Sequence, residues 1–184
     1  TFALERAKVC SGKKFFIATA VPFDDEMCER IRKHREERAA TGFETLEAPL
    51  DLAAALRAIP EGTDVTLVDC LTVWLGNLYH EHQNDEVVLV RAIDDFIAAV
   101  RDSRTRVIFV TNEVGCGIVP ENPLARKFRD AQGLLNRRVA ALCDDVYMVV
   151  CGIPMHLTPF PPPLSPRLRS GIERGGLDVQ RKSN

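Results

Sequence analysis

The sequence predicts an α/β fold with a mainly parallel sheet and helices on both faces. Four short apolar runs are rich in the β-branched and aromatic residues typical of strands. They are continuous instead of alternating, as expected of strands that are covered on both faces. Segments with helical spacing separate them, and this alternation favours parallel pairing through right-handed crossovers. The runs cover residues 15–18, 65–68, 107–110 and 146–150.

Three longer segments between these runs carry helical patterns. Residues 24–38 are polar and rich in charge, and the segment opens on acidic residues, which suit a helix N-terminus. Apolar side chains recur at helical spacing over residues 92–100 and again over residues 124–142. Asn122 followed by Pro123 supplies an N-cap and a first helical position for the last segment.

Size and composition indicate one soluble domain. The 184 residues are 46% hydrophobic, which suffices for a single core. A net charge of -2 and a pI of about 6.1 exclude a general affinity for nucleic acid or for an anionic membrane. Because no secretory signal is evident and no apolar run approaches the roughly 20 residues of a membrane span, we expect a cytoplasmic protein with no membrane span.

The composition changes near the C-terminal end of the sequence. A proline run is followed by a polar segment with little apolar content, which cannot bury enough surface to offset the entropy of ordering it. We therefore expect residues 1–156 to form the globular domain and residues 157–184 to form a Pro-rich flexible tail.

The predicted helix 24–38 holds the first candidate for chemistry. Arg30, His34 and Arg38 are spaced four residues apart and share one face of a helix. Two guanidinium groups beside an imidazole would bind a polyphosphate and favour the neutral, nucleophilic form of the histidine. The alternative is a solvated, charged helix in which the histidine has no special role.

Two further candidates follow strands, where ligands bind in parallel sheets. Asp69 directly follows the apolar run 65–68. In many nucleotide-loop enzymes a carboxylate at the end of such a strand holds Mg²⁺. The alternative is an aspartate that only caps the next element. The segment 111–123 carries Gly115 and Gly117, which permit close approach of a backbone to a ligand. It is either a ligand lid or a loop that only turns the chain into the next helix.

A third motif, Ser-Gly-Lys-Lys at residues 11–14, does not fit a phosphate loop. Such a loop follows a strand, precedes a helix, and needs an earlier glycine and a hydroxyl residue after the lysine. Here an apolar strand follows the motif instead. We therefore interpret residues 11–14 as a turn from a helix into a strand.

Taken in order and with their spacing, these motifs resemble the CobU family, the bifunctional adenosylcobinamide kinases and adenosylcobinamide-phosphate guanylyltransferases. The likeness extends to about Ile153. It is carried by IATA at 17–20, DDEM at 24–27, RI at 30–31, HR at 34–35, VDCLT at 68–72, TNEVG at 111–115 and GIVPEN at 117–122. The resemblance implies a P-loop NTPase fold of RecA-like type, a place in cobalamin biosynthesis, and a homotrimer whose neighbouring subunits complete the sites.

The resemblance also implies the reaction and the residues that carry it. His34 matches the nucleophile that takes GMP from GTP and passes it to adenosylcobinamide phosphate, which gives adenosylcobinamide-GDP. The substrates would be GTP, ATP, adenosylcobinamide and its phosphate, with Mg²⁺ on the nucleotide and Asp69 as its ligand. The residues that match the nucleotide site are Ala18, Thr19, Ala20, Arg35, Glu36, Glu37, Arg38, Glu47 and Asp69. One residue more than the family's usual spacing separates Arg38 from Glu47.

The first residues match the helix that directly follows the family's phosphate loop. Residues 1–6 have a helical pattern without a preceding cap, so we expect that the strand and Gly-rich loop before them are missing. Without that loop the kinase reaction would be crippled and guanylyl transfer weakened. Two alternatives stay open: a catalytically impaired remnant that binds nucleotide or corrinoid or joins intact copies, and an unrelated nucleotide-loop kinase.

Overall fold

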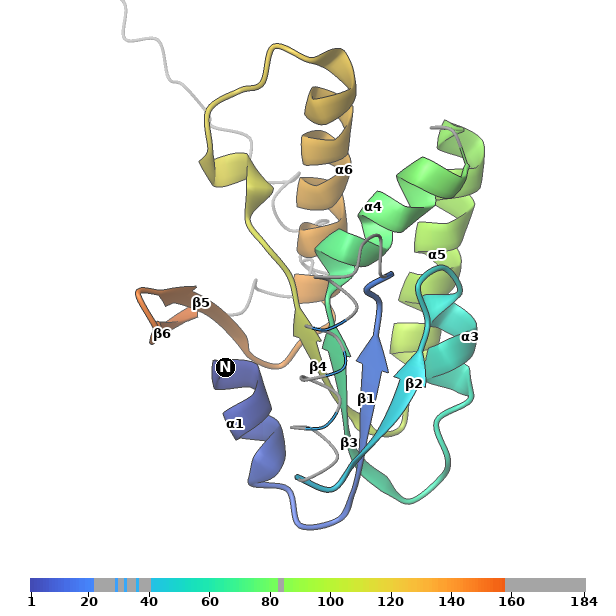
Figure 1. Cartoon of the computed structure of the whole chain (residues 1–184), viewed down its shortest axis with the longest axis vertical. Coiled ribbons are helices and arrows are strands. Elements are labelled where there is room, and N and C mark those ends of the chain that lie inside the picture. Colours follow the sequence, from blue (N-terminus) through green and yellow to red (C-terminus); the bar gives the residue numbers. More distant parts are fainter. Residues whose placement is uncertain (22–28, 30–31, 33–35, 37–40, 83–84, 158–184) are drawn as a thin grey trace, which may run out of the picture.

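The computed structural model describes residues 1–21, 29, 32, 36, 41–82 and 85–157, and it has the predicted α/β architecture (Figure 1). A four-stranded sheet has the order β2-β1-β3-β4, and every neighbouring pair in it is parallel. Its strands are β1 (Lys13–Ala18), β2 (Phe43–Glu47), β3 (Thr63–Asp69) and β4 (Arg106–Val110).

Helices cover both faces of this sheet. The elements are α1 (Phe2–Lys8), α3 (Leu52–Arg57), α4 (Leu71–Glu81), α5 (Glu86–Asp102), the short 3₁₀ helix η1 (Val114–Cys116) and α6 (Pro123–Ala140). The cluster of buried residues on one face joins α3, α4, α5 and α6 to Ile17 and Val68, and the cluster on the other joins α1 to Phe16 and Leu67. Adjacent residues of one strand thus enter opposite cores, which explains the continuous apolar runs.

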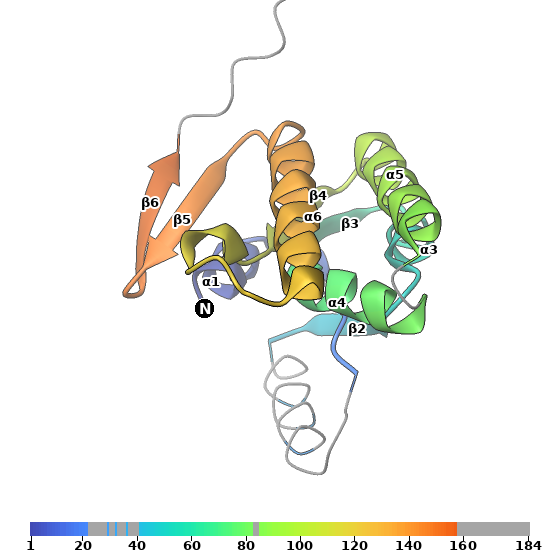
Figure 2. The same ribbon diagram turned by 90° about the horizontal axis from the view of Figure 1, so that it is seen from above.

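The fourth predicted run forms a strand, but not in the parallel sheet. β5 (Val146–Val150) pairs antiparallel with β6 (Ile153–Leu157) in a separate two-stranded sheet. Cys151 and Gly152, which connect them, have φ values of 52° and 79°, the left-handed conformations of a two-residue hairpin turn. The hairpin lies beside α1, where the rings of Phe2 and Tyr147 are 5.1 Å apart (Figure 2).

The long helical patterns are confirmed. Residues 92–100 lie within α5 and most of 124–142 lies within α6, whose N-terminus is capped by Asn122 as predicted. The Asn122 side chain accepts hydrogen bonds from the backbone N–H groups of Leu124 and Ala125, at 2.8 and 3.2 Å.

Some elements of the structure were not predicted from the sequence, and some predicted segments lie outside the described residues. The elements that the sequence did not reveal are β2, α3, α4 and β6. The predicted helix 24–38 lies largely outside the described residues, but Glu29, Arg32 and Glu36 within it are helical, and Arg32 pairs with both carboxylates. Leu157, the first residue of the predicted tail 157–184, is instead the last residue of β6. The rest of the predicted tail lies outside the described part of the chain.

The segment 11–14 is the predicted turn from helix to strand, since α1 ends at Lys8 and β1 begins at Lys13. The turn is held against the start of β3, because the Gly12 N–H donates to the Asp64 carboxylate at 3.1 Å. A Cβ atom on Gly12 would lie only 2.8 Å from the Asp64 Cβ. Position 12 therefore has no room for a side chain.

We expect Gly12→Ala to lower the free energy of unfolding by about 1–3 kcal/mol, the usual range for overpacking. Gly133→Ala is a matched control on α6, where nothing lies within 4 Å of the added Cβ. That change should raise stability by about 0.5–1 kcal/mol, because alanine is the better helix former. Chemical denaturation measures both, and an unchanged Gly12→Ala variant would contradict the close contact with Asp64.

Candidate functional site

The carboxyl ends of the four parallel strands meet at one edge of the sheet (Figure 1). Ala18 of β1 is in register with Glu47 on one side and with Asp69 on the other, and Asp69 is in register with Val110. With strands about 4.8 Å apart, the backbones at Glu47 and Asp69 are separated by roughly 10 Å. The structure thus brings together three residues that the sequence assigned to a nucleotide site, and the extra residue before Glu47 does not remove it from this edge.

These residues also share one face of the sheet. Ala18 packs against the cluster that contains α1, and in-register residues of parallel strands point to the same side. Glu47 and Asp69, both exposed, therefore present their carboxylates on the α1 side. Their binding of a nucleotide stays a prediction.

Thr19 is fully buried and links the end of β1 to the corner that follows β3. Its hydroxyl accepts a hydrogen bond from the Cys70 N–H at 2.8 Å and donates to the Cys70 carbonyl at 2.9 Å. The Thr19 N–H donates to the Asp69 carbonyl at 3.2 Å. The Thr19 side chain is thus committed to the protein, so it contributes to this edge by fixing the positions of Ala18 and Asp69.

α4 extends the same anchoring to the end of β2. The buried Asn77 amide donates to the carbonyls of Thr19 and Pro49, at 2.8 and 3.0 Å. The Trp74 indole N–H donates to the Leu50 carbonyl at 2.7 Å. The segment after Glu47 is therefore fixed to the same helix that follows Asp69.

The N-terminus of α4 is capped by a thiol. Cys70 Sγ accepts from the Val73 N–H at 3.4 Å. Burial raises the pKa of this thiol, and the negative charge of Asp69 adds to the effect, while the hydrogen bond from Val73 opposes it. Cys70 therefore stays protonated at neutral pH and acts as a cap, not as a nucleophile.

The end of β4 carries a polar network that sequence analysis only partly anticipated. Asn136 of α6 donates to the Glu113 carboxylate at 2.8 Å and to the Asn112 carbonyl at 3.1 Å, and it accepts from the Thr111 hydroxyl at 2.6 Å. Thr72 of α4 accepts from the Asn112 N–H at 3.0 Å. The base of the segment 111–123 is thus bound to two helices, and Glu113 is held at the sheet edge.

Asn136 and its neighbour Gln132 were missed, although the sequence contains a sign of them. They are polar residues spaced by one helical turn inside the apolar stripe of the segment 124–142. Gln132 is fully buried and donates to Thr111 and to Asn136, at 3.0 and 2.8 Å. Polar side chains in a buried stripe need such partners, so their spacing predicts a polar network under that helix.

Ala20 follows Thr19 directly after β1 and is partly buried. The predicted residues around His34 lie mostly outside the described part of the chain. Among them only Glu36 is described, and its exposed carboxylate pairs with Arg32. The positions outside the described residues are His34, Arg35, Glu37 and Arg38. Their roles therefore stay predictions.

The predicted ligand of Mg²⁺, Asp69, lies at the sheet edge. Among the described residues, His, Cys, Asp and Glu side chains do not gather in any group of three that could ligate a metal. Mg²⁺ is usually held by one or two carboxylates together with substrate phosphates, and Asp69 fits that requirement as a single oxygen donor. Within the same ranges, every helix falls short of the length and apolar character that a membrane span requires.

A parallel sheet that is covered on both faces and carries acidic side chains at its carboxyl edge defines an α/β fold of the type that binds ligands at that edge. The family model of cobinamide kinase / cobinamide phosphate guanyltransferase matches residues 1–157. The chain belongs to this family of bifunctional enzymes, whose fold is of the P-loop NTPase type. The resemblance found in the sequence is thereby confirmed.

Curated relatives agree with this assignment. The chain is 42% identical over 149 residues to the bifunctional adenosylcobalamin biosynthesis protein CobU of Salmonella typhimurium, an alignment that covers 75% of this chain and 82% of the relative. The bifunctional adenosylcobalamin biosynthesis protein CobP of Pseudomonas aeruginosa is 41% identical over 142 residues, and the alignment covers 77% of this chain and 80% of the relative. CobU of Escherichia coli is 36% identical over 154 residues, and this alignment covers 78% of this chain and 84% of the relative.

We expect Thr19→Val to lower the free energy of unfolding by about 1–3 kcal/mol, because the buried Cys70 N–H would lose its partner and the Cys70 carbonyl would keep only the Trp74 N–H. Thr66→Val on β3 is a matched control. Thr66 is also fully buried, but its hydroxyl has no hydrogen-bond partner among the described residues. The control should be neutral or stabilising in urea denaturation, and equal losses in the two variants would argue against the Thr19 anchor.

Proposed function

We propose that this chain is an enzyme of adenosylcobalamin biosynthesis with two successive activities. It phosphorylates adenosylcobinamide with ATP or GTP, and it then transfers GMP from GTP to the resulting adenosylcobinamide phosphate, which gives adenosylcobinamide-GDP. The observation that carries the proposal is the family match over residues 1–157, which spans the motif with His34 and the whole sheet edge. The names of the three relatives place them in the same pathway.

The guanylyl transfer is proposed to proceed in two displacements at phosphorus. A neutral His34 nitrogen attacks the α-phosphorus of GTP, so that an N–P bond forms and the bond to pyrophosphate breaks. An oxygen of adenosylcobinamide phosphate then attacks the same phosphorus, and the N–P bond breaks to return a neutral imidazole. A covalent intermediate divides one difficult transfer into two easier ones.

The residues at the sheet edge are proposed to bind the nucleotide. Ala18, Thr19 and Ala20 would supply the backbone beneath it, and the acidic side chains of Glu47 and Asp69 flank that backbone on the neighbouring strands. Asp69 would hold Mg²⁺, which offsets the charge of the transferring phosphates when it is bound. The Thr19 anchor keeps these groups fixed, so little ordering is needed when the nucleotide binds.

Further residues around His34 complete the proposal. Arg35 and Arg38 would pair with phosphate oxygens, as guanidinium groups do in bidentate contacts. Glu36 and Glu37 would lie along the same nucleotide. We also propose that the protein is a cytoplasmic homotrimer, and sedimentation of the purified chain tests the oligomeric state.

The test of the histidine mechanism is a labelling experiment with Mg²⁺ and α-labelled GTP. We expect an acid-labile, alkali-stable label on the protein, the stability typical of an N–P bond, and we expect it to be lost in His34→Asn because that variant lacks the proposed nucleophilic nitrogen. His80→Asn is the control, since His80 is an exposed residue near the end of α4 and should leave the label unchanged.

Addition of adenosylcobinamide phosphate should discharge the label into a GMP-bearing product. A label that persists in His34→Asn would refute the assigned nucleophile. The absence of any label on the parent chain would refute the guanylyl-histidine mechanism and favour a remnant that only binds its ligands.

A further inference from the structure

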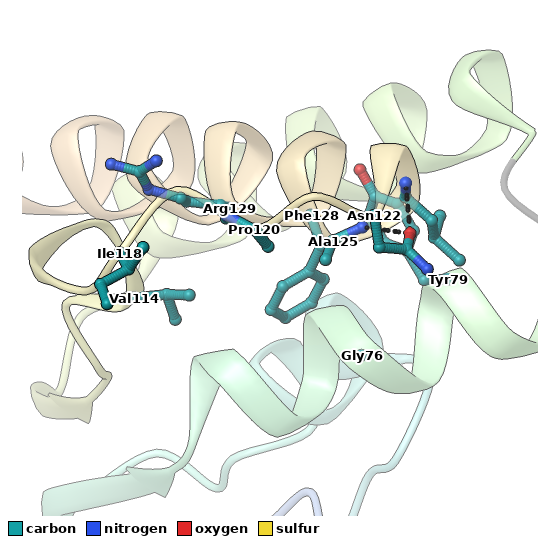
Figure 3. Close-up of a pocket in the computed structure, with 10 residues that line it drawn as sticks. Gly76, Tyr79, Val114, Ile118, Pro120, Asn122, Ala125, Phe128 and Arg129 are labelled. Atoms are coloured by element: carbon teal, nitrogen blue, oxygen red, sulfur yellow. Dashed lines mark hydrogen bonds between the residues drawn. The ribbon is translucent and has the colours of Figure 1, made fainter.

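A hollow opens between α4, α6 and the segment that follows β4 (Figure 3). Its volume is about 460 Å³, within the range of small-molecule sites. Gly76 and Tyr79 line it from α4, Phe128 lines it from α6, and Ile118 and Pro120 line it from the segment between. The rings of Tyr79 and Phe128 meet edge to face, with centroids 5.5 Å apart. The lining is therefore mainly apolar and partly aromatic.

The wall of the hollow is fixed by hydrogen bonds from α6. Arg126 donates to the Pro120 carbonyl and Arg129 donates to the Gly115 carbonyl, each at 3.0 Å. Asn122, which also lines the hollow, is held by its bonds to the first turn of α6. A wall that is already in place loses little conformational entropy when a ligand binds.

Apolar side chains are exposed around this hollow. Ile118 is 96% exposed, Val119 is 59% exposed and Leu124 is 45% exposed. Single exposed apolar residues are common, but a group of them beside an apolar hollow indicates a surface that a partner covers. The ligand should therefore be larger than the hollow and extend over its rim.

Gly76 gives a second, independent indication of a ligand. It lies in the interior of α4, where glycine destabilises a helix relative to alanine. Its φ is not left-handed, and nothing lies within 4 Å of the position that a Cβ would take. Packing does not require a glycine here, and the room that the absent side chain leaves belongs to the hollow.

The chemistry of the hollow distinguishes between the two kinds of substrate. A nucleoside triphosphate needs cations and hydrogen-bond donors for its phosphates, whereas this surface is apolar, and its two arginines donate to backbone carbonyls. A corrinoid is a large, flat macrocycle with methyl groups and amide arms along its rim. An open apolar hollow suits the rim, and the side chain of Asn122 at its edge can bind an amide arm.

We propose that the hollow between α4, α6 and the segment 114–122 binds the methyl-bearing and amide-bearing rim of the cobinamide substrate. This inference rests on the proposed function, which makes adenosylcobinamide a substrate. The hollow lies on the α4 and α6 side of the sheet, and the carboxylates of Glu47 and Asp69 point to the α1 side. Both sites adjoin the same edge, so the reacting groups of the two substrates can meet there.

The test uses the full chain and adenosylcobinamide itself, with bound corrinoid measured by its visible absorbance after ultrafiltration. Gly76→Leu should place a side chain in the hollow from α4, since a Cβ there meets nothing within 4 Å, and we expect it to weaken binding by at least about tenfold. Gly133→Leu is the matched control on α6, where a Cβ also meets nothing within 4 Å and the residue does not line the hollow. It should leave the affinity unchanged.

Two further measurements separate this inference from the proposed function. The GTP-dependent label on His34 should form equally in the parent and in Gly76→Leu, because it needs no corrinoid. Thermal unfolding should show that Gly76→Leu is no less stable than the parent. A Gly76→Leu variant that binds adenosylcobinamide as tightly as the parent would overturn the inference and leave the guanylyl transfer intact.

Three other results would also overturn the inference. In the first, the parent chain binds no adenosylcobinamide. In the second, Gly133→Leu loses as much affinity as Gly76→Leu. In the third, Gly76→Leu dissociates an oligomer but keeps its affinity for the corrinoid, which would make the hollow a contact between copies of the chain. A parent chain that forms no label would refute the proposed function by itself, whatever the corrinoid measurements show.

Discussion

The arrangement of the sheet edge depends on the pair of hydrogen bonds between the Thr19 hydroxyl and the backbone of Cys70. The one buried Thr19 side chain bonds both the N–H and the C=O of Cys70, the residue between the end of β3 and the start of α4. The Trp74 N–H also donates to that carbonyl, so losing the hydroxyl would leave the buried Cys70 N–H without its partner. The direction in which α4 leaves the sheet is thereby coupled to the end of β1.

Because α4 is fixed in this way, it can organise all four strand ends. Cys70 connects it to β3, Asn77 and Trp74 hold the segment that follows β2, and Thr72 holds the segment that follows β4. Asn77 also binds the Thr19 carbonyl and so adds a second link to β1. A short helix therefore positions both the acidic residues at the edge and the wall of the hollow.

The sequence was sufficient to predict those elements whose pattern is contained in their own residues and their near neighbours in the chain. β1, β3 and β4 are covered on both faces and hence have uninterrupted apolar runs, and Asn122 caps α6 through its own two neighbours. β2 was missed because the run Phe43–Glu47 contains only two apolar residues, Phe43 and Leu46, and is stabilised by pairing with β1. The run that forms β5 was placed in the parallel sheet because its antiparallel partner β6 was not predicted, and only one of the two left-handed turn residues, Gly152, is a glycine.

The same holds for the candidate site: residues that the local sequence marks were predicted, and contacts between elements far apart in the chain were not. Asp69 could be predicted because it ends a strand, whereas the contact of Asn136 with Glu113 joins residues from two separate elements. The hollow depends on an absent side chain at Gly76, which only the folded chain makes visible as open space. The proposed reaction joins a highly charged nucleotide to a bulky corrinoid with methyl and amide groups along its rim, and it needs unlike surfaces close together. The edge of a parallel sheet provides them, because its two faces carry different side chains and end at the same line of backbone.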